Sequence, residues 1–416
     1  MKKETKKAPT IRFRGFNDEW EQRKLEDFGR ATGGTSIESE FNKEGKYKVI
    51  SIGSYSENST YTDQGIRCNL TEKTQNRILN KNDLTMILND KTAVGRIIGR
   101  VLLIEQDNSY VYNQRTERIE PNKNKYDPLF LYEMLNAPGI RSKIVRQCQG
   151  NTQIYVNWPV IANQKYKIPE LKEQKIIGFF LKDLDHLITL HQRKLDQLKT
   201  LKKYFMQNMF PAKGEKVPRI RFKGFTGDWE QRKLEDLASF SKGAGYSKSD
   251  LQVSGTPIVL YGRLYTKYET VIKDVDTFVD ALANSVYSQG GEVIVPASGE
   301  TAEDISIASV VEKPGIVLGG DLNIIHPSDD LDSTFLAISI SNGNPHKEMA
   351  KRAQGKSVVH LHNNDLAQIK LLYPSVTEQR KISQYFSGLD TLITLHQHKL
   401  DQLQTMKKFM LQNLFI

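Results

Sequence analysis

Two long stretches of the chain, residues 169–210 and 374–415, repeat apolar residues at alternating intervals of four and three. That spacing places the apolar side chains along one side of an α-helix and is typical of a coiled coil. Eight of the ten seam positions are apolar in each stretch, and the two exceptions fall at matching places. The seam positions that recur every seven residues are Ile177, Leu184, His191, Leu198, Ile382, Leu389, His396 and Leu403.

One of the two exceptions in each stretch is a lysine, Lys202 in the first and Lys407 in the second, and these lysines indicate how the helices pair. Parallel helices in register would place both lysines in one layer and bring like charges together in a partly buried position. Antiparallel pairing moves the lysines to opposite ends of the seam. The sequence therefore predicts an antiparallel coiled coil, as expected of two duplicated halves related by a pseudo-twofold axis.

Outside these helices the pattern changes to short apolar runs that open with turn residues. Residues 82–90 and 291–299 are typical of buried strands, and the Ile- and Val-rich segments after them continue in that manner. Short helices are predicted from Pro128 to Leu135 and from Ser333 to Ser341. The predicted fold class is α+β, with two similar mixed α/β domains separated by the two long helices.

The sequence is an internal duplication. The stretch "LITLHQRKLDQL" at Leu187 returns as "LITLHQHKLDQL" at Leu392, and "WEQRKLED" at Trp20 returns unchanged at Trp229. Each half has a short shared segment, a long variable block and a shared helix, and the chain is too long for one ordinary core. The predicted divisions are shared segments at 1–27 and 216–236, variable domains at 28–167 and 237–372, a central helix at 168–215 and a distal helix at 373–416.

The net charge of +10, from 59 Lys and Arg against 49 Asp and Glu, favours polyanionic ligands such as nucleic acid. Two cysteines, Cys68 and Cys148, are too few to staple a chain of this length, as expected in a reducing compartment. No run reaches the length of a membrane span, and the N-terminus lacks the apolar core of a signal peptide. We therefore expect a cytoplasmic protein without a membrane partner.

Motifs for catalysis are weak throughout the sequence. "NPHK" at Asn344 lacks the second proline and the aromatic residue of the loop that holds a flipped base in adenine methyltransferases. "AKRAQGKS" has Ala350 where a phosphate-binding loop needs glycine. "EQK" at Glu173 is similar to the end of a nuclease motif but begins a heptad helix, so we expect it to face solvent or a partner. His360 and His362 could lie on one side of a strand, but no Cys or carboxylate that converges on them is evident in the sequence, so no metal site is predicted.

Helices of about 36 residues at about 1.5 Å per residue predict a spacer of roughly 54 Å. In an antiparallel pair, one variable domain would sit at each end of this spacer. On duplex DNA, at about 3.4 Å per base pair, the domains would lie on the order of 15 base pairs apart. The sequence therefore predicts a reader of a two-part DNA target with a gap of fixed length and two different half-sites.

The repeated WEQRKLED block, the helix starts "ELKEQKII" at Glu170 and "SVTEQRKI" at Ser375, and the turns "QGNT" at Gln149 and "QGKS" at Gln354 resemble the specificity subunit of type I restriction-modification systems. The resemblance covers the whole chain. It implies that the variable blocks are target-recognition domains that read a bipartite, asymmetric duplex, and that the repeats form the spacer and bind two modification subunits.

The same resemblance implies which chemistry belongs to partners. S-adenosylmethionine would be bound by the methyltransferase subunits, and ATP and Mg²⁺ by restriction subunits with translocase and nuclease activity. The chain itself would be a non-catalytic recognition and scaffold subunit without a cofactor or a metal.

The DNA-binding candidates are basic, amide, hydroxyl and tyrosine residues that flank the predicted strands and turns. Arg and Lys pair with guanine edges and phosphates, whereas Asn and Gln pair with adenine. The candidates are Lys91, Arg96, Arg100, Asn113, Gln114, Arg115, Gln149 and Thr152 in the first half, and Lys242, Tyr246, Lys248, Arg263, Ser298, Gln354, Lys356 and Ser357 in the second.

Two other classes of function are alternatives. A nuclease with duplicated catalytic domains would repeat the same acidic and basic residues in both halves, but the halves differ where catalysis would take place. A protein-interaction adaptor would bind proteins through the variable domains, and its binding would not weaken steeply with salt as DNA binding does.

The shared segments also predict where the ends of the sequence lie. "KVPRIRFKGF" from Lys216 follows the first long helix, and the similar "KAPTIRFRGF" from Lys7 opens the chain. We therefore expect the N-terminal segment to lie close to the end of the second long helix.

Overall fold

The computed structural model describes residues 8–355 and 358–416, which form two compact units. Unit 1 consists of the chain up to Gln192 together with His398–Ile416, and unit 2 consists of Arg193–Gln397. Unit 1 is therefore completed by residues that are far from the rest of it in sequence.

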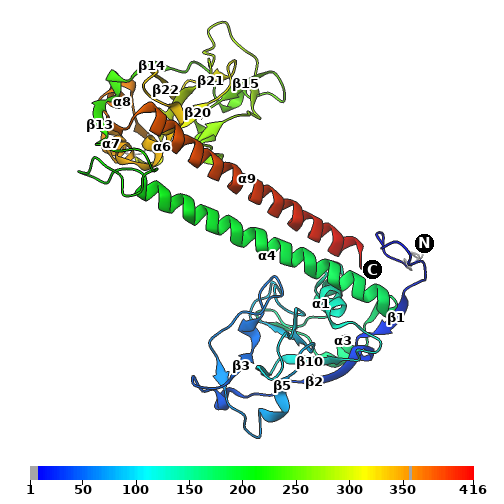
Figure 1. Ribbon diagram of the computed structural model, residues 1–416. Coiled ribbons are helices and arrows are strands. Elements are labelled where there is room, and N and C mark those ends of the chain that lie inside the picture. Colours follow the sequence, from blue (N-terminus) through cyan, green and yellow to red (C-terminus); the bar gives the residue numbers. More distant parts are fainter. Residues whose placement is uncertain (1–7, 356–357) are drawn as a thin grey trace. The chain divides into compact units, whose positions relative to one another are not determined.

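Two long helices, α4 (Leu171–Asn208) and α9 (Val376–Asn413), occupy the stretches with the coiled-coil pattern (Figure 1). Unit 1 contains the first part of α4 and the last part of α9, and unit 2 contains the other two parts. Among the described helices, including these two, none combines the length and the apolar content of a membrane span.

Within unit 1 the two helical segments run antiparallel. Lys407 of α9 donates a hydrogen bond of 2.6 Å to Asp185 of α4. Eight residues further along the chain, Phe415 packs against Phe130, and the backbone of Phe130 lies against Gly178 of α4. The α9 segment therefore runs in the opposite direction to the α4 segment, as the seam lysines predict.

Unit 2 repeats this arrangement. Lys202 of α4 forms an ion pair with Asp390 of α9, and the rings of Phe205 and Tyr385 are 5.1 Å apart. Each seam lysine thus meets an aspartate rather than the other lysine. The prediction of antiparallel pairing is confirmed in each unit.

The core of unit 1 is a four-stranded sheet in the order β2-β10-β6-β8, with a second sheet, β4-β3-β9-β5, packed against it. Strand β6 is buried throughout because both of its faces are covered: Met86 packs with Phe130 of α1, and Ile87 packs with Leu102. The strands are β1 (Glu21–Lys24), β2 (Gly29–Gly33), β3 (Tyr47–Ile50), β4 (Arg67–Cys68), β5 (Ile78–Leu79), β6 (Leu84–Ile87), β7 (Asn89–Asp90), β8 (Val101–Leu103), β9 (Tyr110–Tyr112), β10 (Thr116–Pro121), β11 (Ile154–Tyr155) and β12 (Lys165–Ile168). The short helices are α1 (Pro128–Asn136), α2 (Pro138–Val145) and α3 (Trp158–Ala162).

Unit 2 repeats this plan with a five-stranded sheet in the order β14-β22-β18-β20-β16 and a smaller sheet, β17-β15-β21. The strands are β13 (Glu230–Lys233), β14 (Ala238–Lys242), β15 (Thr256–Val259), β16 (Val271–Ile272), β17 (Phe278–Val279), β18 (Glu292–Pro296), β19 (Ser298–Gly299), β20 (Ser309–Val311), β21 (Val317–Leu318), β22 (Leu322–Pro327), β23 (Val359–His360) and β24 (Lys370–Tyr373). The short helices are α5 (Gly262–Thr266), α6 (Ser333–Asn342), α7 (Asn344–Arg352) and α8 (Asn363–Ala367). The predicted α+β fold with an internal duplication is confirmed.

Helices α1 and α6 begin where the sequence predicts, because an aspartate caps each of them. Asp127 accepts a hydrogen bond of 2.9 Å from the backbone of Phe130 at the start of α1, and Asp332 does the same for Phe335 in α6. The shared glutamine at the start of each long helix holds this cap, since Gln174 accepts a hydrogen bond of 2.9 Å from the backbone of Asp127.

The residue before that glutamine corrects one expectation. Glu173 does not face solvent or a partner, because its side chain is fully buried and accepts two hydrogen bonds of 2.8 Å from Arg12. Glu378 is bound by Arg221 in the same manner, at 2.7 Å. The "EQ" pairs are therefore structural links between the shared segments and the long helices.

Candidate nucleic-acid interface

In unit 1 one strand of the central sheet continues past the sheet into a two-stranded ribbon. Leu88 lies between β6 and β7 and bonds to the chain on both sides. Its backbone N–H donates a hydrogen bond of 2.8 Å to the carbonyl of Arg115, and its own carbonyl accepts a hydrogen bond of 2.9 Å from the N–H of Val156. Strand β7 then pairs with β11, so that Asn89 lies opposite Tyr155. The chain around this ribbon forms a surface that we call the ribbon end of unit 1, made of residues 88–96, 114–115 and 149–156.

Unit 2 has the same arrangement at Ala297, between β18 and β19. Its N–H donates a hydrogen bond of 2.9 Å to the carbonyl of Asp321, and its carbonyl accepts a hydrogen bond of 3.0 Å from the N–H of Leu361. Strand β19 pairs with β23, so that Ser298 lies opposite His360. The ribbon end of unit 2 consists of residues 297–304, 320–321, 354–355 and 358–361.

The QG turns form the tips of both ribbon ends. The backbones of Gln149 and Tyr155 exchange hydrogen bonds of 2.8 and 2.9 Å, and those of Gln354 and His360 exchange bonds of 3.1 and 2.8 Å. A side chain at Gly150 would place its Cβ 2.2 Å from the carbonyl oxygen of Gln153, and φ there is +99°. The turn therefore requires glycine.

A hydrogen-bond network centred on Glu38 fixes the turn that carries Arg115. Glu38 accepts hydrogen bonds of 2.9 Å from Asn113 and 2.8 Å from the Gln114 side chain. Hydrogen bonds from Ser36, Asn113 and Gln114 lower the pKa of Glu38 to about 2, so its carboxylate is charged at neutral pH. Arg115 follows this network with φ of +67° and an exposed side chain. Asn113 and Gln114 thus hold the turn in place, and the turn exposes the side chain of Arg115.

The structure brings several of the predicted DNA-binding residues together at the ribbon ends. In unit 1 these are Lys91, Arg96, Arg115, Gln149 and Thr152, and in unit 2 they are Ser298 and Gln354. Lys242 is the last residue of β14, and Tyr246 and Lys248 lie in the segment after it, in which Gly245 accepts a hydrogen bond of 2.8 Å from Gly320, beside Asp321. Lys356 and Ser357 lie outside the described residues.

Arg263 is not at a ribbon end. Its guanidinium is buried and donates hydrogen bonds of 2.7 Å to both Asp276 and Glu269. These contacts hold α5 to the chain that follows it, and they occupy the charge that a phosphate would need.

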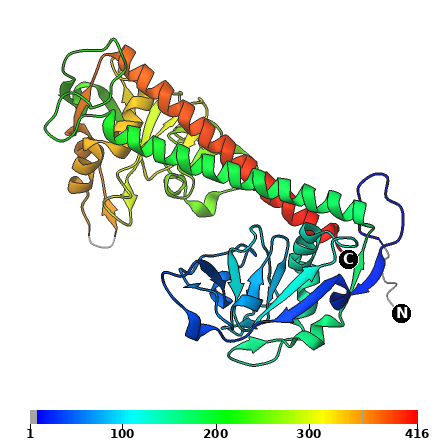
Figure 2. The same cartoon turned by 60° about the horizontal axis from the view of Figure 1, so that its bottom comes forward.

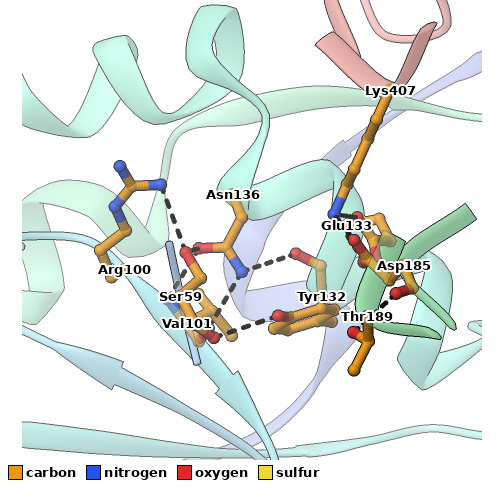
Figure 3. Close-up of polar contacts among 9 residues, drawn as sticks. All are labelled: Ser59, Arg100, Val101, Tyr132, Glu133, Asn136, Asp185, Thr189 and Lys407. Atoms are coloured by element: carbon orange, nitrogen blue, oxygen red, sulfur yellow. Dashed lines mark hydrogen bonds and ion pairs between the residues drawn. The ribbon is translucent and has the colours of Figure 1, made fainter. Parts of the chain in front are cut away.

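Arg100 lies in a different place, a cavity of about 950 Å³ in unit 1 between the variable block and the helical segments (Figure 3). Its guanidinium donates a 3.3 Å hydrogen bond to Ser59, whose carbonyl accepts 3.0 Å from the Tyr132 hydroxyl. On the opposite wall, Lys407 lies between Asp185 and Glu133.

Glu133 is the most perturbed carboxyl group of this cavity. Its side chain is only 4% exposed, and burial raises its pKa to about 7 despite the charge of Lys407 at 4.0 Å. Unit 2 has the same Lys–Asp pair but Ile338 at the place of Glu133. The additional acid is therefore specific to unit 1.

Some ribbon-end residues are missing from the sequence-based set, namely Tyr155, His360, Glu300 and Asp321. Also missing are Arg146 and Lys351, which stand just before the QG turns. Arg146 directly follows α2 and Lys351 lies in the last turn of α7, and both side chains are exposed. Each stands three residues before the glutamine of a QG turn. That equal spacing in the two halves is a signal from which the sequence could have identified this pair.

The family described as the type I restriction modification DNA specificity domain matches residues 17–200 and 226–405, one match in each half of the chain. The chain belongs to this family. Each half is a DNA specificity domain of a type I restriction-modification system, and the chain is the specificity component, whose role is recognition. The predicted resemblance is confirmed.

Similar proteins agree with this assignment. The type I restriction enzyme MjaVIII specificity subunit of Methanocaldococcus jannaschii is 23% identical over 406 residues, which cover 94% of this chain and 91% of the relative. The putative MjaX specificity subunit of the same organism is 24% identical over 334 residues, 75% of this chain and 73% of the relative. The fold resembles that of the S subunit of a type I restriction-modification system from M. genitalium, with a TM-score of 0.65 at 16% identity over 98% of this chain and 99% of that one.

Proposed function

We propose that each unit binds duplex DNA through its ribbon end and reads one part of a bipartite, asymmetric target. One observation carries the proposal: both units build the same backbone frame at the end of the central sheet but present different side chains from it. Tyr155 and Arg115 in unit 1 correspond to His360 and Asp321 in unit 2. The same frame with different side chains suits two readers of different sequences.

The long helices supply the partner surface in this proposal. Leu190 and Leu395, at matching places in the duplication, are 53% and 61% exposed, and Leu187 and Leu392 beside them are also exposed. In unit 1, Leu187 lies about 200° around the helix from Asp185, which faces the cavity, so it points away from the variable block. Exposed leucines at repeated helical positions favour a protein partner.

Each unit carries one such patch, and its segment of the other long helix also exposes large apolar residues. These are Met406 and Phe409 in unit 1, and Leu201 and Tyr204 in unit 2. Two equivalent patches suit two copies of one partner, and we propose two modification subunits. S-adenosylmethionine would then be bound by those subunits, and ATP and Mg²⁺ by restriction subunits. The site of action would be the DNA in the cytoplasm.

Mapping of adenine methylation tests the proposal. The chain is co-expressed with its modification subunits, and the experiment is repeated after residues 237–372 are exchanged for the block of a related chain. We expect a two-part motif of which only one part changes. A motif that stays the same after the exchange would show that unit 2 does not read DNA and would favour the adaptor function.

A further inference from the structure

The two ribbon ends carry opposite charges at equivalent positions. Lys91 follows β7 and Glu300 follows β19, and both are exposed and followed by Thr-Ala. Arg115 and Asp321 accept the equivalent hydrogen bonds from Leu88 and Ala297, and both side chains are exposed. At both positions a basic residue in unit 1 is replaced by an acidic residue in unit 2.

Charge reversal separates two kinds of DNA contact. Phosphates are negative at every base pair, so a position that contacts phosphate in both units should keep a positive or neutral donor. Base edges present acceptors or donors according to the sequence, so a position that reads bases can carry opposite charges in two readers of different sequences.

A second pair of positions keeps its charge. Ile144 in α2 and Met349 in α7 are the buried residues that align the two helices, and two residues later stand Arg146 and Lys351. Both side chains are exposed, and within the described residues neither forms an ion pair with the protein. They lie directly before the QG turns, where a constant positive charge suits a phosphate.

The backbone at Arg115 gives independent support. An arginine with φ of +67° is in the left-handed region, which glycine and asparagine adopt at lower cost. The Glu38 network holds this conformation, and among the described residues no protein group binds the guanidinium. A strained, preorganised and unpaired arginine is typical of a ligand contact.

We propose that Arg115 and Lys91 contact base edges in the half-site read by unit 1, that Asp321 and Glu300 contact base edges in the half-site read by unit 2, and that Arg146 and Lys351 contact phosphates. This inference rests on the proposed function and assigns its residues. The fork of Arg115 suits the two acceptors of guanine, O6 and N7, and the carboxylate of Asp321 suits an exocyclic amino group such as cytosine N4.

The test uses the chain in its complex with the modification subunits. For Arg115→Gln and Asp321→Asn we expect the methylated motif to lose discrimination at a base in one half-site only, by roughly 5- to 150-fold. For Arg146→Gln and Lys351→Gln we expect an unchanged motif and a slope of log Kd against log salt that is less steep by about one. Lys213→Gln, an exposed lysine in the segment after α4, is the matched control and should change neither.

The outcomes distinguish this inference from the proposed function. If Arg115→Gln and Asp321→Asn leave the motif unchanged, whether or not the salt slope falls, the positions do not read bases and the inference is overturned. A changed motif in Arg146→Gln would overturn the phosphate assignment. If the unaltered complex methylates without any motif that depends on this chain, the proposed function itself is wrong. Thermal unfolding of each variant confirms that it is folded.

Discussion

Arg12 donates two hydrogen bonds of 2.8 Å to Glu173, joining the N-terminal shared segment to the start of α4 across 161 positions of sequence. The glutamate is fully buried, so the guanidinium takes the place of the water that would otherwise solvate the carboxylate. The pair has a duplicate in Arg221 and Glu378, which allows the same experiment to be carried out in both units.

Removal of either arginine should destabilise its own unit. We expect Arg12→Ala to lower the free energy of unfolding of unit 1 by about 3 kcal/mol, because it leaves a buried carboxylate without its partner. Hydrogen exchange of amides in each unit measures the effect, and Arg221→Ala should show it in unit 2 instead. Arg14→Ala, at an exposed neighbouring arginine, is the control and should cost less than about 0.5 kcal/mol. Equal loss in both units after Arg12→Ala would contradict the local role of the pair.

Glu133 should make the stability of unit 1 depend on pH. Its pKa is raised from 4.5 to about 7, so the folded state binds the proton more tightly than the unfolded state. The stabilisation is fully present below about pH 4.5 and is lost as the pH rises through 7. Lys407 and Asp185 face the same carboxyl group, with opposite effects on its pKa.

We therefore expect Glu133→Gln to flatten the decline in stability between pH 5 and pH 8 by up to about 3 kcal/mol. Urea unfolding at several pH values gives the difference between wild type and variant. That difference isolates Glu133 from Glu117, whose pKa is also raised to about 7 by burial. Glu133→Ile, which copies Ile338 of unit 2, should behave in the same way. Parallel stability curves for wild type and variant would count against this role of Glu133.

A circular permutant should fold. Ile11 donates a 3.3 Å hydrogen bond to the carbonyl of Asn413 near the end of α9 (Figure 2), as Ile220 donates 2.9 Å to Asn208 after α4. In the permutant, the end of α9 is joined to the N-terminal segment and the chain is opened near Lys213. The junction after α9 then becomes continuous, and the equivalent junction after α4 is interrupted instead. We expect the permutant to be soluble and, with modification subunits, to methylate the same motif. Aggregation of the permutant would mean that the junctions are not equivalent.

The apolar patches of the long helices should bind partners independently. We expect Leu190→Asp and Leu395→Asp each to remove one modification subunit from the complex, and the double variant to remove both, because a charge in an apolar interface is costly. Native mass spectrometry measures the stoichiometry. Val253→Asp, at a 98% exposed loop residue, serves as the control and should retain both subunits. Retention of two subunits by the double variant would exclude these patches as the docking surface.

The long helices and the duplication could be predicted because their signals are local or repeat along the chain. Seven-residue periodicity fixes α4 and α9, and the lysines of the seam indicate antiparallel pairing. The start of α1 at Pro128 could be predicted because a capping aspartate and a proline stand together there.

The ribbon ends could not be predicted in this way, because tertiary hydrogen bonding decides which residues meet. Arg115 and Tyr155 come together only because Leu88 bonds to strands on both of its sides. The burial of Glu173 and of Arg263 depends in the same way on partners that periodicity does not indicate. Charged residues are usually exposed, so their sequence alone favours the wrong environment.

The composition of unit 1 also has a consequence for how the protein is made. Leu403, Leu414 and Phe415 belong to its core, so the part of the chain that a ribosome produces first stays incomplete until residues 398–416 have been added. A chain that stops before them leaves Phe130 without its aromatic neighbour Phe415. Unit 1 can therefore fold completely only after the whole chain has been translated. A truncated product would be left as a substrate for chaperones and proteases.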